Sequence, residues 1–374
     1  MPNTDGGHRA AVVIGTRPEA IKLAPVVSEL RKRGIDTTII GTGQHRDLVD
    51  PVLELFGLAL DLDLQIMEAE SSLNAVLSRA IERLGSALET IRPDVVVVQG
   101  DTSSAVGGAL AAFNSRIPVA HVEAGLRSHD LALPFPEEMH RRVISIVTRW
   151  HFAPTEHAAA ELAAERVPGQ VLVTGNTVVD AVNYILSVAT THPHTVTAPE
   201  GPYLLATAHR RESWGAPIRN IALALRDVLE EHSDLSVLFV THPNPKARHP
   251  VEEVLSAQPR ASVVGAMEYD EFLAVLRGAV LAVTDSGGVQ EEGPTLGVPV
   301  LVTREVTERP EGLAAGAVRM VGTRRVNVRR VVGQLLDDPA ERSRMATAGH
   351  RVYGDGTAAT RIVDTLVSDL LRSV

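Results

Sequence analysis

The sequence contains no cysteine and few aromatic residues, which make up 3% of the chain. The absence of thiols excludes disulfides, thiolate metal sites and cysteine nucleophiles. No run approaches the ~18 apolar residues of a membrane-spanning helix, and residues 1–10 lack the apolar segment of a secretory signal. Basic residues number 36 against 46 acidic ones, and the net charge of −10 argues against nucleic acids and anionic membranes as partners. We therefore expect a cytoplasmic globular protein that holds any anionic ligand with local groups.

What the sequence does contain is a regular alternation of short β-branched runs and amphipathic helical stretches. The run VVVV at 95–98 is typical of a parallel strand buried on both faces. The alternation predicts an α/β fold with doubly wound parallel sheets. The expected strands lie at 11–15, 37–41, 94–99, 119–122, 151–153, 203–207, 236–241, 262–264, 280–284 and 298–302, and the expected helices at 18–33, 51–56, 72–91, 218–231 and 358–371.

A chain of 374 residues is long for one core and suits two domains. The alternation lapses near residues 190–202, where HPHTVTAPEGP is typical of a surface loop, and then restarts. We expect an N-terminal Rossmann-like domain at 1–172 and a C-terminal one at 173–357, with the final helix at 358–374 able to pack back on the first. Two such domains would face each other across a cleft at the carboxyl edges of their sheets, where ligands of such sheets bind.

The most informative stretch is TDSGGVQEEGPTLGVPVL, at 284–301. An apolar strand leads into Ser286, Gly287 and Gly288, where a helix is expected to begin, so backbone N–H groups and the positive helix end face one spot. That arrangement suits a phosphate, and two carboxylates, Glu291 and Glu292, follow about one turn later, where the ribose hydroxyls of a nucleotide could reach one of them. The alternative is an ordinary strand-to-helix turn, in which glycine only permits a positive φ.

Three carboxylates stand at prominent places in the first half of the chain. Asp101 follows the VVVV strand, Glu123 follows the next expected strand, and Glu137 opens a helix. Crowded into one cleft, such carboxylates raise one another's pKa toward neutrality, as proton transfer requires. Any one of them alone is equally well explained by structure, Asp101 for example as a helix N-cap. Together they predict acid–base catalysis.

Groups that can bind phosphate occur in both halves. Arg17 lies at the first strand-to-helix turn, where a guanidinium can bind a phosphate in a bidentate manner, although a surface charge is the alternative. His209 and His242 follow strands of the second half, and Arg309 lies further along. Carboxylates thus come mainly from the first half and phosphate binders mainly from the second. This division predicts a nucleotide held by the C-terminal domain, with its appended group facing the carboxylates.

Several common sites are missing from the sequence. The dinucleotide pattern needs three glycines, but the segment at 15–22 has one and the segment at 41–46 lacks the third, so no nicotinamide cofactor is expected. The motif HExxH is absent, and His192 and His194 have no acidic ligands at useful spacing, so no metal site is expected. The hydrolase elbow GxSxG is also missing.

A series of sequence blocks resembles the non-hydrolysing UDP-N-acetylglucosamine 2-epimerases, in the same order and over nearly the whole length. The blocks are GTRPEAIKLAPV (15–26), TGQHRDLVD (42–50), QGDT (99–102), HVEAGLRS (121–128), PFPEE (134–138), FAPTE (152–156), GNTVVDA (175–181), HRRES (209–213), THPNP (241–245) and TDSGGVQEEGPTLGVPVLVTREVTERPEG (284–312).

The resemblance implies two Rossmann-like domains of the glycosyltransferase-B type, a homodimer, and a reversible, cofactor-free reaction. UDP-N-acetylglucosamine would lose UDP to give a 2-acetamidoglucal, and UDP would add back to give UDP-N-acetylmannosamine. Asp101, Glu123 and Glu137 would serve proton transfer at C2, and His209 would contact the diphosphate and assist departure of UDP. The expected substrate-binding set is Arg17, Ser286, Gly287 and Gly288 for the diphosphate, Glu292 for the ribose and Phe272 for the uracil, with Lys22, His242 and Arg309 nearby.

The chain departs from the pattern of that family at a few positions. His140 stands where Asn is usual, one helical turn from Glu137, and could alter the pKa or hydrogen bonds of that carboxylate. Arg142 replaces a smaller polar residue, and Gly293 replaces an alanine. The segment MEAESSL (67–73), with Glu70 and Ser71, lacks the Arg and Gln of a second, regulatory substrate site, so activation there is not expected. Other residues of that site remain, namely Gln44, His45, Arg210 and His242.

Three alternatives stay open at this point. A hydrolysing epimerase would use the same residues and release UDP with glucal or free sugar, and His140 is the feature that could make the difference. A glycosyltransferase would share the nucleotide-binding half but would not need three carboxylates in the other half. A non-catalytic UDP-sugar sensor would bind without turnover and would not need the acids that are present.

Overall fold

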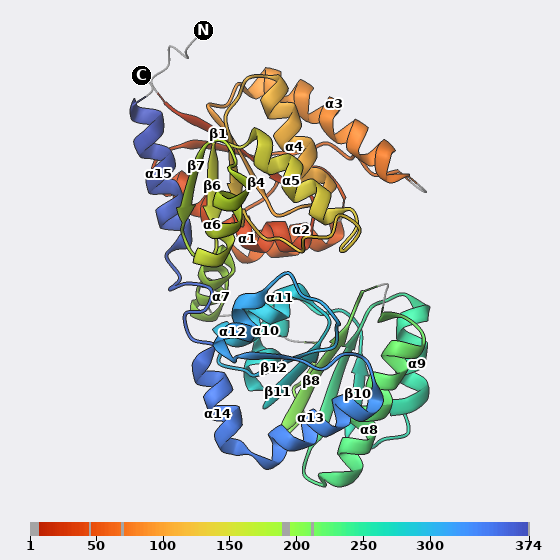
Figure 1. Cartoon of the computed structure of the whole chain (residues 1–374). Helices are drawn as coiled ribbons and strands as arrows, with labels where there is room; N and C mark the ends of the chain where they lie inside the picture. Colours follow the sequence, from red (N-terminus) through yellow and green to blue (C-terminus); the bar gives the residue numbers. More distant parts are fainter. Residues whose placement is uncertain (1–6, 45, 69–70, 189–194, 211–212, 373–374) are drawn as a thin grey trace. The chain divides into compact units, whose positions relative to one another are not determined.

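The computed structural model of the chain describes residues 7–44, 46–68, 71–188, 195–210 and 213–372. The chain forms two compact units, each built around a parallel sheet (Figure 1). Unit 1 comprises Met1–Ser187 and Gly354–Val374, and unit 2 comprises Val188–Tyr353. The predicted fold class, α/β with two Rossmann-like domains, is confirmed.

In the described part of unit 1, seven parallel strands form a sheet in the order β3-β2-β1-β4-β5-β6-β7. They are β1 (Arg9–Ile14), β2 (Asp36–Gly41), β3 (Leu62–Asp63), β4 (Val95–Gln99), β5 (Val119–Val122), β6 (Trp150–Ala153) and β7 (Gln170–Val173). β4 is buried along its whole length, as its VVVV run predicts. β1 and β4 are neighbours at the point where the strand order reverses, which is where doubly wound sheets bind ligands.

Helices cover both faces of this sheet. In one layer α3 (Leu73–Ile91), α4 (Ser103–Asn114) and α5 (Glu137–Val147) pack side by side. The other layer contains α1 (Arg17–Lys32), α2 (Arg46–Leu55), α7 (Thr177–Ser187) and α15 (Ala358–Arg372), while α6 (Glu156–Glu165) follows β6.

The final helix α15 belongs to unit 1. Asp180 of α7 accepts hydrogen bonds from the N–H groups of Ala358, at 3.2 Å, and Ala359, at 2.9 Å. The indole of Trp150 in β6 donates to Asp369 of α15 at 2.7 Å. Because α7 packs on α1 and α15, unit 1 extends past the expected boundary at residues 172–173.

In the described part of unit 2, six parallel strands have the order β10-β9-β8-β11-β12-β13. They are β8 (Tyr203–Ala208), β9 (Ser236–Thr241), β10 (Ala261–Val264), β11 (Leu281–Thr284), β12 (Val300–Val302) and β13 (Val318–Met320). The strand order reverses between β8 and β11, which pair directly. The sheet therefore repeats the switch point of unit 1.

The core of unit 2 has two halves, one on each face of the sheet. Alternate residues of β8 divide between them: Leu204 and Ala206 lie in one, Tyr203 and Leu205 in the other. The first half is shared with α8 (Ala216–Glu231), α9 (Pro245–Leu255) and α13 (Arg325–Asp337), and the second with α10 (Tyr269–Gly278) and α11 (Gly287–Thr295). The remaining helices are α12 (Pro310–Ala315) and α14 (Pro339–Ala348).

A few elements differ from expectation. The helix expected at 51–56 begins earlier, at Arg46, so Pro51 lies inside α2 rather than at its start. The strand expected at 298–302 is shorter, Val300–Val302, because Pro299 has no N–H to join the ladder. The short edge strands β3, β7 and β13 were not predicted. Among the helices that the structure describes, none is long and apolar enough to cross a membrane.

Candidate active site

The predicted residues of unit 1 gather at one sheet edge. Arg17 begins α1 after β1, Asp101 lies between β4 and α4, and Glu123 follows β5. Because β1, β4 and β5 are neighbours in the sheet, these three residues share the edge at the switch point. Glu137 comes instead from the first residue of α5, where it is half-buried.

Glu123 and Lys22 form a buried ion pair. Both side chains are only 5% exposed, and the Lys22 ammonium donates to the Glu123 carboxylate. Glu123 has a φ of +62°, which is energetically unfavourable for a residue other than glycine and is frequent at functional sites. The carboxylate is therefore held in a fixed direction, and its charge is compensated inside the protein.

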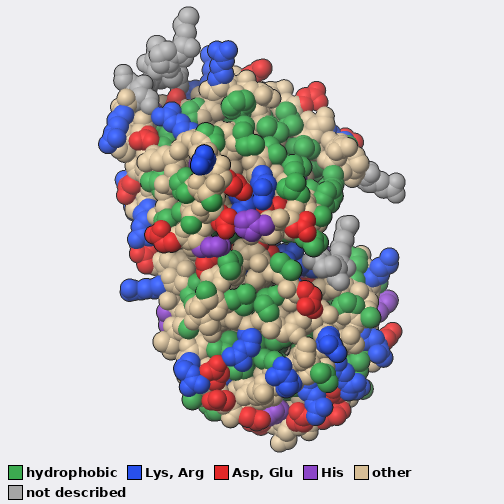
Figure 2. Space-filling model, in the orientation of Figure 1, with side chains coloured by type: hydrophobic (Ala, Val, Ile, Leu, Met, Phe, Trp, Pro, Cys, Tyr) green, Lys and Arg blue, Asp and Glu red, His purple; other side chains and the backbone are tan. Residues whose placement is uncertain are grey.

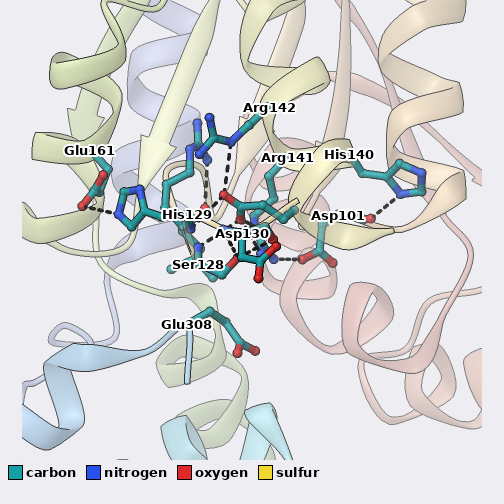
Figure 3. A network of polar contacts seen from close by, with 12 residues as sticks. Asp101, Ser128, His129, Asp130, His140, Arg141, Arg142, Glu161 and Glu308 are labelled. Atoms are coloured by element: carbon teal, nitrogen blue, oxygen red, sulfur yellow. Dashed lines mark hydrogen bonds and ion pairs between the residues drawn. The ribbon is translucent and has the colours of Figure 1, made fainter. Parts of the chain in front are cut away.

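The turn that carries Asp101 is held by side chains of α5 and β5. Arg141, buried in α5, forms an ion pair with the Asp101 carboxylate (Figure 3). Two histidine rings reach backbone carbonyl oxygens: His140 Nδ1 lies 2.8 Å from Asp101 O, and His121 Nε2 lies 2.8 Å from Gly100 O. Burial lowers the pKa of His121 to about 3, although the hydrogen bond to Gly100 acts in the opposite direction. The His121 ring is therefore neutral at neutral pH.

Glu138 organises the cations around this turn, and the sequence analysis missed it. Its buried carboxylate accepts hydrogen bonds from Arg141 Nη2 at 2.7 Å, from Arg142 Nε at 3.2 Å and from the N–H of Ser128 at 3.0 Å. Burial would raise the pKa of Glu138, but these hydrogen bonds lower it below its ordinary value. Glu138 thereby orients Arg141 toward Asp101. Its spacing of three and four residues from two arginines on one helix is the signal that could have identified it.

Glu19 joins two loops of the same edge and was also missed. Its buried carboxylate accepts hydrogen bonds from the N–H groups of Gly15, at 2.9 Å, and Thr16, at 2.7 Å, and from the hydroxyls of Thr16, at 2.9 Å, and Thr102, at 2.6 Å. Burial raises the pKa of Glu19 to about 7, while these hydrogen bonds act to lower it. The capping box of Thr16 and Glu19 is visible in the sequence, but the contact with Thr102, 83 residues away, is not.

In unit 2 the predicted phosphate-binding residues form the N-terminus of α11. Ser286 is the N-cap residue, with extended backbone and no side-chain capping hydrogen bond, and Gly287 and Gly288 open the helix. All three are half-buried, so the turn is partly open to solvent. The first N–H groups of a helix have no intrahelical partner, and such a turn suits an anion.

Arg309 packs on this turn. A Cβ atom on Gly287 would lie 2.8 Å from Arg309 Nη1, so glycine is what permits the guanidinium to approach so closely. Arg309 Nε donates to Glu291 at 2.6 Å, and its Nη1 pairs with Glu308. Two buried carboxylates therefore hold the guanidinium beside the helix N-terminus.

Glu308 lies among three arginines and was not singled out in the sequence. Its carboxylate is 3.1 Å from Arg304 Nη1 and 3.5 Å from Arg210 Nη2, and it contacts Arg309. Burial alone would raise the pKa of Glu308, but the three guanidinium groups hold it well below its usual range. This edge of unit 2 thus brings three arginines together around Glu308, one of which is also held by Glu291.

Asp285 fixes the loop that carries His209. Its carboxylate, with no exposed surface, accepts hydrogen bonds from the N–H groups of His209 at 3.0 Å and Arg210 at 3.1 Å. It therefore connects the loop after β11 with the loop after β8. The sequence separation of 76 residues to His209 explains why no local pattern revealed this role.

The two predicted histidines of unit 2 lie close to each other. Their ring centroids are 6.4 Å apart in an edge-on arrangement, and the Trp214 ring lies 5.7 Å from that of His242. The N–H of Asn244 donates to His242 Nδ1 at 3.0 Å, so the proton of the neutral His242 ring is on Nε2.

Two further predicted ligand contacts lie deeper. Phe272 of α10 is 9% exposed and belongs to the apolar core that contains Met267 and Val275. Glu292 of α11 is 6% exposed, and a Cβ atom on Gly288 would lie 3.5 Å from its carboxylate. The uracil and ribose contacts assigned to these side chains stay predictions.

The positions that depart from the family pattern have clear surroundings. His140 contacts the backbone of Asp101, while its expected effect on Glu137 stays a prediction. A Cβ atom on Gly293 would lie 2.4 Å from a methyl group of Val300, so the small residue makes room for a larger neighbour. Of the remaining regulatory positions, Gln44 accepts a hydrogen bond from Ser104, whereas His45 and Glu70 lie outside the described residues.

Metal ligands do not cluster in the part of the chain that the structure describes. No group of three or more His, Asp or Glu residues there could hold a metal ion. The histidines considered for this role, His192 and His194, lie outside the described residues, as do Arg211 and Glu212 of the block HRRES.

Known proteins resemble this chain over nearly its full length. The UDP-N-acetylglucosamine 2-epimerase family matches residues 28–367. The UDP-N-acetylglucosamine 2-epimerase of Neisseria meningitidis serogroup A is 40% identical, with 96% of this chain and 100% of that protein covered. The enzyme of Bacillus subtilis with the same name is 41% identical, with 96% and 95% covered.

Solved structures agree with the sequence comparison. A crystal structure of the Neisseria meningitidis enzyme bound to UDP-GlcNAc has a TM-score of 0.89 at 38% identity, covering 96% of this chain and 100% of that one. The Methanocaldococcus jannaschii enzyme, in complex with UDP-GlcNAc and UDP, has a TM-score of 0.80 at 31% identity, covering 96% and 99%. The chain therefore belongs to the UDP-N-acetylglucosamine 2-epimerase family.

Proposed function

We propose that the chain interconverts UDP-N-acetylglucosamine and UDP-N-acetylmannosamine by eliminating UDP and adding it back. The observation that carries this proposal is the pair of carboxylates at the edge of unit 1, Asp101 and Glu123, each matched by a buried cation. Relatives in the same family have been solved with UDP-GlcNAc or UDP bound, which supports the same class of ligand here.

The chemistry explains why elimination precedes epimerisation. The C2–H bond of an N-acetylhexosamine has no adjacent carbonyl and is not acidic in the ground state. Breaking the C1–O bond to UDP gives C1 oxocarbenium character, which acidifies C2–H. A carboxylate then removes the proton, and the pair of electrons forms the C1–C2 double bond of 2-acetamidoglucal. Return of a proton to the opposite face of C2 and addition of UDP at C1 give the epimer, with no net oxidation.

In this proposal unit 1 supplies the acid–base groups. Asp101, Glu123 and Glu137 serve the removal and return of the C2 proton. The side chains of the first two differ in exposure, 27% for Asp101 and 5% for Glu123, and one is paired with a guanidinium and the other with an ammonium. Such different surroundings support different roles for chemically similar groups.

Unit 2 supplies the groups that bind UDP. The N-terminus of α11 and the guanidinium of Arg309 beside it suit the diphosphate, whose negative charge grows as the C1–O bond breaks. His209, fixed by Asp285, assists the departure of UDP. The other proposed substrate-binding residues are Arg17, Lys22, His242, Phe272, Ser286, Gly287, Gly288 and Glu292.

Proton NMR of the purified protein with UDP-N-acetylglucosamine in D2O, without added cofactor, tests this function. We expect UDP-N-acetylmannosamine to accumulate with deuterium at C2, because the abstracted proton exchanges with solvent before it returns. Free UDP together with released sugar or glucal would identify the hydrolysing reaction instead. Binding without any turnover would contradict the epimerase and favour a sensor.

We further propose that the chain forms a homodimer through α4 and α5. Apolar side chains gather over this layer of unit 1 in Figure 2, and Phe113 and Ile146 are 57% and 67% exposed. Such a patch is typical of a protein interface. Light scattering is expected to give a dimer for the wild type and for Leu371→Glu, which places the same charge on an exposed position of α15, but a monomer for Ile146→Glu. A monomeric wild type, or an unaffected Ile146→Glu, would contradict this interface.

The cytoplasmic location stays a prediction from the sequence. Fractionation of cells that produce the tagged chain would test it, and recovery with the membranes or the medium would contradict it.

A further inference from the structure

The turn Gly100–Thr102 is held at consecutive polar groups by four side chains from three separate elements. The Gly100 carbonyl accepts from His121 of β5, and the Thr102 hydroxyl donates to Glu19 of α1. The Asp101 carboxylate pairs with Arg141 of α5. The remaining group is the carbonyl oxygen of Asp101 itself, and its partner is His140 Nδ1 at 2.8 Å (Figure 3).

The direction of this hydrogen bond follows from the chemistry of the two atoms. A carbonyl oxygen can only accept, so Nδ1 of His140 must carry the proton that it donates. His140 is 4% exposed, so its ring is fixed by packing in α5. The imidazole of His140 therefore donates to the main-chain carbonyl of Asp101, while the next residue of α5, Arg141, pairs with the Asp101 side chain.

We propose that His140 is a positioning residue that sets the direction of the Asp101 carboxylate through the Asp101 carbonyl group. The inference rests on the proposed epimerase function for its kinetic part and on the geometry of the turn for its structural part. Without this hydrogen bond, the peptide unit between Asp101 and Thr102 could turn about the Asp101 Cα–C and Thr102 N–Cα bonds, and the resulting shift of the Asp101 backbone would carry its carboxylate with it. A misplacement of about 1 Å at a reacting group can cost up to about 100-fold in rate.

Three substitutions at His140 distinguish the effect of losing the hydrogen bond from the effect of losing the volume of the ring. In His140→Asn, the amide nitrogen is two bonds from Cβ, as Nδ1 is in histidine, so the donor is kept. In His140→Gln the amide nitrogen lies one bond further out, where it corresponds to Nε2, so the donor is misplaced. His140→Leu fills the space without any donor. Thermal unfolding and circular dichroism of each variant verify that it is folded.

The kinetic readout is kcat against KM for epimerisation of UDP-N-acetylglucosamine. We expect kcat to fall about 10- to 100-fold in His140→Leu and His140→Gln, with KM changed less than about threefold, because UDP is bound by other residues. His140→Asn is expected to restore kcat to within about threefold of the wild type. A purely structural role would instead lower the unfolding temperature and leave the activity of the folded fraction unchanged.

The structural readout is hydrogen–deuterium exchange of the peptide that spans residues 97–104, which needs no turnover. His140→Leu is expected to speed exchange in this peptide at least about tenfold, and His140→Asn to leave it at the wild-type rate. Unchanged exchange in His140→Leu, or rescue by Gln rather than Asn, overturns the positioning role. An inactive wild type overturns the proposed function alone, because the exchange result still decides the role of His140.

Discussion

The two sheet edges share one topology but carry different arrangements of charge. In unit 1 the edge at β1 and β4 presents carboxylates, each matched by one cation: Lys22 for Glu123 and Arg141 for Asp101. In unit 2 the edge at β8 and β11 presents three arginines around the carboxylate of Glu308, and Glu291 holds one of them, Arg309, as well. The same corner of a doubly wound sheet is thus built twice, and its side chains suit one copy to proton transfer and the other to phosphate.

The two edges also share a structural feature, a buried carboxylate that bridges two loops. Each has a buried carboxylate that joins the two loops at the switch point, Glu19 in unit 1 and Asp285 in unit 2. Glu19 accepts from two hydroxyls as well as from main-chain N–H groups, whereas Asp285 accepts from the main-chain N–H groups of His209 and Arg210. The loops are therefore fixed in the same place by chemically different contacts.

The largest effects are expected where the carboxylates of unit 1 are neutralised. Asp101→Asn and Glu123→Gln should lower turnover about 100-fold or more, because neither amide can take up the C2 proton. The affinity for UDP should stay nearly unchanged, because the proposed UDP-binding groups lie mainly in unit 2. Calorimetric titration with UDP and a kinetic assay of epimerisation measure the two quantities separately.

Arg309→Ala is the matched test from the other edge. It removes a guanidinium beside Gly287 and should weaken UDP binding and lower the rate together. The division between the edges would be wrong if Asp101→Asn kept wild-type turnover, or if it weakened UDP binding as strongly as Arg309→Ala.

The next largest effect is expected in the response of the unit 1 edge to acid. His121 has an ordinary pKa near 6.5 in the unfolded chain but a pKa of about 3 in the folded protein. Between these values the unfolded state binds more protons, so the free energy of unfolding falls as the pH decreases. At pH 5 this loss is about 2 kcal/mol for His121.

His121→Gln tests this prediction, because its amide nitrogen corresponds to Nε2 and keeps the donor to Gly100 without titrating. Urea unfolding at pH 7 and pH 5 should show that the wild type loses about 2 kcal/mol more than the variant. The pKa of His151 is also lowered by burial, but this residue is present in both proteins, so its contribution to the loss of stability cancels in the comparison. The chain has 2 tryptophans, so a Trp214→Phe background reports on unit 1 through Trp150 alone. Equal losses in both proteins would contradict the acid sensitivity of His121.

Much of the fold was predictable because its strands are buried on both faces. Central strands such as β4 and β9 are continuous apolar runs, and these stand out in the sequence. The edge strands β3 and β7 did not, because they are only 2 and 4 residues long and lie partly exposed at the sheet edges. The break after the first unit was placed too early for a similar reason, since α7 is typical of either domain until its packing on α1 is known.

The candidate site was predictable only where a residue follows a strand. Asp101 and Glu123 stand directly after apolar runs, and parallel strands bring such positions to one edge. Glu138 and Asp285 act through partners, and the contacts of Asp285 cross 76 residues of sequence. A buried carboxylate that binds main-chain N–H groups leaves no local pattern, so tertiary structure was needed to identify it.

A smaller effect is expected from one methyl group at the turn that we propose to bind phosphate. Gly287→Ala would place a Cβ atom 2.8 Å from Arg309 Nη1, and the guanidinium cannot retreat freely because Glu291 and Glu308 hold it. The dissociation constant for UDP should therefore rise about tenfold, or about 1.4 kcal/mol. The same substitution in an Arg309→Ala background should cost little, because the clash is gone. Additive losses in this double-mutant cycle would show that Gly287→Ala acts by another route.

The smallest effect is expected at Glu19, and it separates the two loop-joining carboxylates. In Glu19→Gln the amide oxygen can accept from Gly15 and Thr16, while the amide nitrogen donates to the Thr102 hydroxyl, which can reverse its role. At pH 5, where a pKa of about 7 keeps Glu19 protonated in the folded protein, the free energy of unfolding should change by less than about 1 kcal/mol.

In Asp285→Asn no partner can reverse its role, because main-chain N–H groups only donate. The amide nitrogen of the variant would face one of these N–H groups, so that donor would lose an acceptor. This variant should lose about 1–3 kcal/mol. It should also displace His209, whose N–H binds Asp285, and so lower turnover as well as stability. Urea unfolding of both variants at one pH gives the comparison directly. A larger loss in Glu19→Gln than in Asp285→Asn would contradict this comparison. It would mean that the Thr102 hydroxyl cannot change from donor to acceptor.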